Sequence, residues 1–108
     1  MNLNQFQTEA KVFNKVMAND RVQHTVLGLN QEAGEVAGKF KKALRDDDNF
    51  ITTSRRRDIG YELGDVLWYV ADLAGEIGYT LEEIATMNLN KLKDRERRGV
   101  LGGSGDGR

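Results

Sequence analysis

Two long stretches of the chain repeat apolar side chains at helical spacing, and the 108-residue sequence contains no proline. Each residue of an α-helix turns by about 100°, so residues three and four apart share one face. Proline is the strongest helix breaker, so its absence suits a mostly helical chain. The pattern predicts helices over residues 21–45 and 54–77. Their apolar stripes are Val22, Val26, Leu29, Ala33, Val36, Phe40 and Leu44 in the first, and Ile59, Leu63, Val66, Val70, Leu73 and Ile77 in the second.

Two further helices are predicted around this pair. A narrow apolar stripe indicates a first helix over residues 3–18, and Thr80-x-x-Glu83 is the capping box that begins a last one. The middle of the helix over 54–77 is apolar around most of its circumference, and a chain this short has few elements to cover it. We therefore expect an all-α, four-helix-bundle-like protomer that forms a homodimer or homotetramer.

Composition limits the classes of protein that remain. The length predicts one domain, over residues 1–98, followed by a flexible glycine-rich tail over 99–108. No cysteine is present, which excludes disulfide and thiolate chemistry and makes the cytoplasm the expected compartment. The formal net charge of −1, with acids and bases mixed, argues against a nucleic-acid partner. The sequence shows neither a secretory signal nor an apolar run of about 20 residues. We therefore expect neither export nor a membrane span.

The two long helices carry the same short phrase, which reads acid, apolar, glycine, acid, valine at residues 32–36 and 62–66. Helical spacing sets both pairs of acids beside the apolar stripes, at the rim of the seam between the helices. Converging carboxylates repel one another unless a cation joins them, and oxygen ligands favour Mg²⁺, with Mn²⁺ as a substitute. The alternative is two solvated helix faces. The predicted ligands are Glu32, Glu35, Glu62 and Asp65, and the glycines Gly34 and Gly64 suggest a close approach.

Several charged groups allow two interpretations. Lys39, four residues after Glu35, forms either an ion pair along the helix or a phosphate contact. The aspartates at 46–48 are expected in a solvated connection between helices. The arginines at 55–57 could pair with those aspartates, a partner subunit or an anionic substrate. The single histidine, His24, is expected to be a surface or packing residue.

Polar residues near the apolar faces are candidate ligand contacts. Tyr69 lies four residues after Asp65 and is either an interface aromatic or a substrate contact. In the last helix Asn88, Lys91 and Arg95 share a narrow stripe. Two bases and an amide in line suit a phosphate-bearing ligand. An exposed basic end, favoured by the helix dipole, is the alternative.

The double acidic motif, with 26 residues between Glu35 and Glu62, resembles the signature of the MazG-like all-α nucleoside triphosphate pyrophosphohydrolases. The text around the second phrase, Glu62-Leu-Gly-Asp-Val-Leu-Trp-Tyr69, and Asn88-x-x-Lys-Leu-x-x-Arg95 in the last helix agree with it. The resemblance covers most of residues 26–95. It implies a helical bundle assembled as a dimer or tetramer and a Mg²⁺-dependent enzyme. The reaction would convert a nucleoside triphosphate and water to the monophosphate and pyrophosphate, in nucleotide-pool house-cleaning.

By position, the resemblance makes the four acids the metal ligands and catalytic residues, with Glu35 as the expected general base. It implies phosphate contacts at Lys39, Lys91 and Arg95, and further substrate contacts at Tyr69 and Asn88. Other interpretations stay open. They are a non-catalytic helical dimerisation module, a carboxylate-bridged di-iron bundle, and a related helical dUTPase or phosphoribosyl-ATP pyrophosphatase.

Overall fold

The computed structural model describes residues 1–107, which are helical apart from turns and the chain ends. The helices are α1 (Leu3–Lys11), α2 (Arg21–Asp46), α3 (Thr53–Glu76) and α4 (Leu81–Arg98), with a 3-10 turn η1 (Ala18–Asp20) before α2. No strand occurs among the described residues. The predicted all-α class is confirmed.

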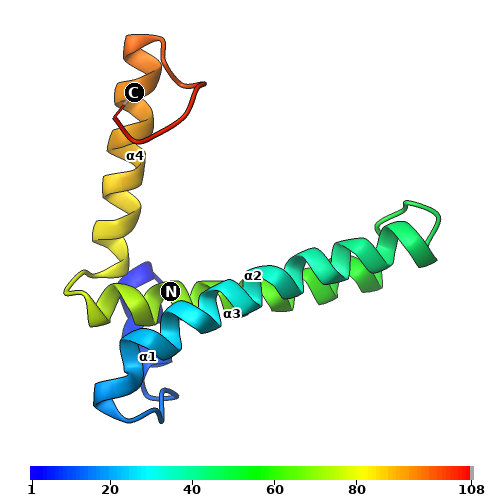
Figure 1. The fold of residues 1–108 in the computed structure, drawn as a ribbon, viewed down its shortest axis with the longest axis horizontal. Helices are drawn as coiled ribbons and strands as arrows, with labels where there is room; N and C mark the ends of the chain where they lie inside the picture. Colours follow the sequence, from blue (N-terminus) through cyan, green and yellow to red (C-terminus); the bar gives the residue numbers. More distant parts are fainter. Residues whose placement is uncertain (108) are drawn as a thin grey trace.

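Helices α2 and α3 form a long antiparallel hairpin, and α1 and α4 lie at the end where α2 begins and α3 ends (Figure 1). Helix α4 packs on α1 and α3 and points away from the hairpin, without contacting α2. The Cα radius of gyration is 16.7 Å, whereas a compact domain of this length has about 13 Å. A single chain is therefore open and does not enclose its own apolar faces.

The first helix is shorter than predicted, because α1 ends at Lys11 rather than near residue 18. The cause is Asn14, whose side-chain oxygen accepts a hydrogen bond from the backbone N–H of Val16 at 2.9 Å. Its amide nitrogen also donates to Asp72 on α3 at 2.7 Å. Such local bonds compete with helix formation. The chain turns here, and Phe13 is left 72% exposed.

The other helices begin and end close to the predicted positions. Helix α3 is capped by Thr52, whose hydroxyl accepts from the backbone N–H of Arg55 at 3.1 Å. Helix α4 has the predicted capping box of Thr80 and Glu83. Asp20 directly precedes α2, but its side chain makes no capping bond.

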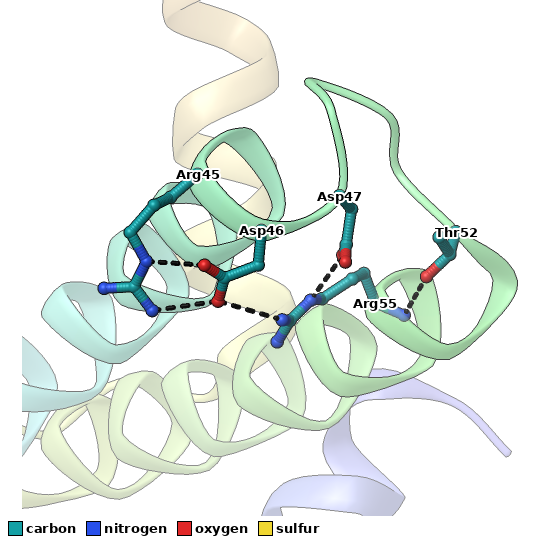
Figure 2. Close-up of polar contacts among 5 residues, drawn as sticks. All are labelled: Arg45, Asp46, Asp47, Thr52 and Arg55. Atoms are coloured by element: carbon teal, nitrogen blue, oxygen red, sulfur yellow. Dashed lines mark hydrogen bonds and ion pairs between the residues drawn. The ribbon is translucent and has the colours of Figure 1, made fainter.

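Two of the three aspartates at the turn between α2 and α3, Asp46 and Asp47, form ion pairs (Figure 2). Arg45 donates to Asp46 through Nε at 2.7 Å, and Arg55 donates to Asp47 through Nε at 2.8 Å. A second Arg55 nitrogen lies 3.8 Å from Asp46. The hydrogen bond from Arg45 holds the pKa of Asp46 below its usual range. The open question about the arginine run is thus answered for Arg55, which neutralises the aspartates of the turn.

Helix α1 is fixed to the rest of the chain by Gln7 and Trp68. The Gln7 amide nitrogen donates to the carbonyls of Ala71 and Tyr79, both at 3.1 Å, and its oxygen accepts from the Leu81 N–H at 2.9 Å. The Trp68 indole N–H donates to the Ala10 carbonyl at 3.0 Å. These bonds satisfy backbone groups at the junction of three helices.

The core of one chain is small. Among the described residues, the buried apolar side chains are Ala10, Ala43, Ala71, Ala74 and Leu81. Leu27 on α2, Leu63 on α3 and Leu89 on α4 are each more than half exposed. Large apolar patches on a protein surface usually mark an interaction site.

Candidate metal centre

Three of the four predicted carboxylates meet at the rim of the α2–α3 seam. Glu32 comes from α2, and Glu62 and Asp65 come from successive turns of α3. One carboxylate oxygen of each lies within 4.8 Å of the other two. Glu32 and Glu62 are half-buried and Asp65 is exposed. We call these three residues the acidic rim.

Glu35 is exposed, and it does not belong to the group of carboxylates whose oxygens lie within 4.8 Å of one another. Its charge nevertheless reaches the rim, because it contributes to the raised pKa of Glu32. The fourth acid of the double motif therefore borders the rim within one chain, and does not share its centre.

The acidic rim is poorly neutralised by the protein. Burial raises the pKa of Glu32 above its ordinary value, and the charges of Asp65 and Glu62 raise it further. Among the described residues, the base in ion-pair contact with the rim is Lys39, whose Nζ lies 4.0 Å from a Glu62 oxygen, at the limit of an ion pair. Lys39 thus faces across the seam to Glu62 rather than along α2 to Glu35. Such a contact compensates little of the mutual repulsion.

Tyr69 lies between the hairpin helices, one turn after Asp65. Its ring packs on Gly28 of α2, where an added Cβ would stand 2.2 Å from a ring carbon. Burial raises the pKa of Tyr69, as do the charges of Glu32 and Asp65. His24 lies against this ring, with centroids 6.1 Å apart, which agrees with its expected packing role.

The predicted close approach at Gly34 and Gly64 is absent within one chain, since nothing would lie within 4 Å of a Cβ at either position. The close approach occurs instead at Gly28 of α2, which was not one of the predicted positions. A glycine one turn before the motif, opposite a tyrosine on the other helix, was the signal that could have identified this contact.

A cavity of about 360 Å³ opens between α1 and α3, and none of the acidic-rim residues lines it. Trp68 and Tyr79 contribute aromatic walls, and Asp72 contributes a buried carboxylate. Burial raises the pKa of Asp72, although the hydrogen bond from Asn14 opposes the shift. Neither Asp72 nor this cavity was predicted, because both depend on where α1 turns away.

The basic stripe of α4 lies apart from the acidic rim in a single chain, because α4 makes no contact with α2. Asn88 is exposed, Lys91 is half-buried and Arg95 is buried. Both bases contact Asp106 in the glycine-rich tail, each at 3.0 Å. The structure therefore groups Lys91 with Arg95 but does not bring them to the carboxylates.

Comparison with known proteins identifies the family of the chain. The sequence model of the MazG nucleotide pyrophosphohydrolase domain matches residues 21–100. The chain belongs to this family, as its double motif indicated. It is also similar to the "Gene 37 protein" of Mycobacterium phage L5, with 51% identity over 87 residues, which cover 81% of this chain and 76% of that protein. No solved structure matches the chain.

No helix in the part of the chain that the structure describes combines the length and apolar character needed to cross a membrane.

Proposed function

We propose that the protein is a Mg²⁺-dependent pyrophosphohydrolase that converts a nucleoside triphosphate to the monophosphate and pyrophosphate, as a nucleotide-pool house-cleaning enzyme. The observation that carries the proposal is the acidic rim in a chain of the MazG family. Three carboxylates within 4.8 Å of one another, with one lysine at 4.0 Å, form a strongly anionic site without a matching cation. An added divalent ion would remove that repulsion.

The donor atoms fit a hard cation. All three rim ligands are carboxylate oxygens, which suit Mg²⁺ or its substitute Mn²⁺ better than a thiolate-preferring metal. We propose Glu32, Glu62 and Asp65 as metal ligands. Glu35 would be either a fourth ligand or the general base. A bound ion would neutralise negative charge on the triphosphate and would polarise a phosphoryl oxygen as a Lewis acid.

The residues around the rim would perform the remaining steps. Glu35 borders the rim and is exposed, so it can accept the proton of the attacking water while the α–β anhydride is cleaved. Lys39 already faces Glu62, and it can contact the pyrophosphate as negative charge develops on the leaving group.

A second subunit would complete the site. Helix α4 leans away from its own acidic rim, so Asn88, Lys91 and Arg95 reach a triphosphate only if α4 of another subunit packs against the hairpin. The exposed leucines on α2, α3 and α4 support such packing. We therefore propose a homodimer or homotetramer built around the domain of residues 1–98. The cytoplasm as its location and the lack of a nucleic-acid partner remain predictions from composition.

The nucleoside end of the substrate would extend along α3. Asp72 follows Asp65 by about two helical turns, or roughly 10 Å of helix rise, and Tyr69 lies between them. The α1–α3 cavity is within the usual size range for a small-ligand site, which begins at about 300 Å³. Asp72 lines that cavity, and Tyr69, which lies between Asp65 and Asp72 along α3, stays the proposed substrate contact.

The test is pyrophosphate release from a panel of ribo- and deoxyribonucleoside triphosphates, with and without Mg²⁺. We expect Mg²⁺-dependent release from at least one nucleotide by the purified full chain. The Glu62→Gln variant should be inactive, and Asp47→Asn, at the ion-paired turn, should retain activity. No release from any nucleotide, together with a stable oligomer, would favour the non-catalytic dimerisation module.

A further inference from the structure

The glycine-rich tail does not extend from the protein but turns back along α4. Figure 1 shows it leaving the end of α4 and returning beside that helix. Gly99, Gly103 and Gly105 have φ values of 72°, 98° and 81°. Residues with side chains rarely adopt this left-handed region, so glycine at these positions permits the reversal. The reversal brings Asp106 onto the basic stripe of α4.

Asp106 contacts both bases through one oxygen. Its Oδ1 accepts a hydrogen bond from Lys91 Nζ at 3.0 Å and another from Arg95 Nη2 at 3.0 Å. The same Arg95 nitrogen donates to the Gly105 carbonyl at 3.3 Å. One anionic oxygen held by a lysine and an arginine is also the arrangement these residues offer to a phosphate oxygen.

The two sides of this contact differ in how firmly they are held. The Arg95 side chain is only 5% exposed, whereas Asp106 is 84% exposed. The Arg95 Nε is buried and has no hydrogen-bond partner. A guanidinium offers five N–H donors, and a buried donor without a partner is costly. The tail carboxylate therefore leaves part of the arginine unsatisfied.

The electrostatics keep Asp106 charged in this position. Hydrogen bonds from Lys91 and Arg95 hold the pKa of its carboxyl below the ordinary value. Asp106 thus places a single negative charge, carried on the glycine-rich tail, against the two positive charges of Lys91 and Arg95 on α4. A phosphate group, with more charge and more acceptor oxygens, can replace it.

We propose that Lys91 and Arg95 form an anion subsite which the chain's own Asp106 occupies in the free protein, and from which a pyrophosphate or triphosphate group displaces it. The identity of the anion as substrate or product rests on the proposed function. The competition itself depends only on the contacts of α4 with the tail. By occupying the subsite, the tail lowers the apparent affinity for phosphate-bearing ligands in proportion to the fraction of molecules in which it is bound.

The experiment is calorimetric titration of the full chain with inorganic pyrophosphate, in the presence of a chelator so that no metal contributes. We expect Asp106→Asn to bind pyrophosphate about three- to tenfold more tightly than the wild type. The matched control is Asp94→Asn. It also removes one negative charge near the C-terminal end of α4, but Asp94 pairs with Arg97 and Arg98 instead of the subsite.

The double variant Lys91→Gln/Asp106→Asn tests whether the gain in pyrophosphate affinity depends on the subsite. Because it lacks Lys91, it should not show the gain seen in Asp106→Asn. Equal or weaker pyrophosphate binding by Asp106→Asn overturns the proposal. So does an equal gain in Asp94→Asn, since the effect would then be general charge.

The nucleotide panel separates this proposal from the proposed function. Tighter pyrophosphate binding by Asp106→Asn without hydrolysis of any nucleotide would leave the subsite standing and remove the enzyme assignment. Nucleotide hydrolysis without tighter pyrophosphate binding by Asp106→Asn would support the enzyme assignment and overturn the subsite. If both hold, pyrophosphate should inhibit the Asp106→Asn enzyme at a lower concentration than the wild type.

Discussion

The α2–α3 hairpin carries acidic groups in two places that the protein treats oppositely. At the turn, Asp46 and Asp47 each have an arginine nitrogen at 2.7–2.8 Å, and the pKa of Asp46 is lowered. At the acidic rim, the ion pair found among the described residues is the longer one of Lys39 with Glu62, at 4.0 Å, and the pKa of Glu32 is raised. The same residue types are thus neutralised at one end and left in repulsion at the other.

The difference separates a structural cluster from a candidate site. Arg45 on α2 and Arg55 on α3 pair with the turn aspartates in an ordinary surface network, whose net contribution to stability is small. Carboxylates that repel one another at a partly buried rim cost stability, and perturbed titration in such a place marks functional-site candidates. We therefore expect an external cation to change the free energy of folding more at the rim than at the turn.

Substitutions in the two clusters should have very different effects on hydrolysis. Glu62→Gln or Asp65→Asn should lower pyrophosphate release by about 10²–10³-fold, the usual cost of losing one charged contact in a transition state. Asp47→Asn should stay close to the wild-type rate. Steady-state kinetics with the best nucleotide of the panel make the measurement, and comparable losses in all three variants would erase the distinction.

Alanine substitutions at two glycines of α2, Gly28 and Gly34, should change the free energy of unfolding in opposite directions. Gly28→Ala drives a methyl group into the Tyr69 ring, so unfolding should require about 1–3 kcal/mol less free energy. Gly34→Ala meets nothing within 4 Å in one chain and should gain up to about 1 kcal/mol from helix propensity. Urea denaturation gives both values. A loss of stability in Gly34→Ala, with a shift to smaller species on a sizing column, would place Gly34 in a subunit interface.

Removing one carboxylate from each cluster should change the melting temperature in opposite directions. Without added metal, Glu32→Gln relieves repulsion and should raise Tm by a few degrees, while Asp46→Asn breaks an ion pair and should lower it slightly. Thermal denaturation in a chelating buffer gives both values. A lower Tm for Glu32→Gln would show that the rim carboxylates are already compensated in the apo protein.

The smallest effect concerns pH. The folded-state pKa of Asp46 is depressed below 3.8, so its contribution to stability is present above that value and is lost as the pH falls through the folded pKa. The Tm difference between the wild type and Asp46→Asn should therefore be constant from neutral pH down to about pH 5 and vanish in stronger acid. A difference that grows on acidification would mean that the sign is wrong.

Helical arithmetic predicted much of the fold and part of the site. The positions of α2, α3 and α4 follow from apolar periodicity and capping residues. The meeting of Glu32 with Glu62 and Asp65 follows from packing two such stripes together. These features depend on local spacing, which a single sequence displays directly.

What the sequence did not reveal depends on contacts between distant residues. Helix α1 ends early because Asn14 reaches Asp72 on α3, and Gln7 gains its role only where three helices meet. Glu35 borders the rim instead of joining it, since facing side chains on antiparallel helices do not meet at every turn. The contact of Asp106 with Lys91 likewise requires the tail to reverse, which composition alone had suggested would be flexible.

The most direct measurement is calorimetric titration of Mn²⁺ or Mg²⁺ into the purified wild type, Glu62→Gln and Asp47→Asn, each with a non-hydrolysable triphosphate present. The prediction is saturable binding to the wild type and to Asp47→Asn, and its loss in Glu62→Gln. Equal binding to all three proteins, or binding to none, would contradict a divalent-cation site made by the acids of the two hairpin helices.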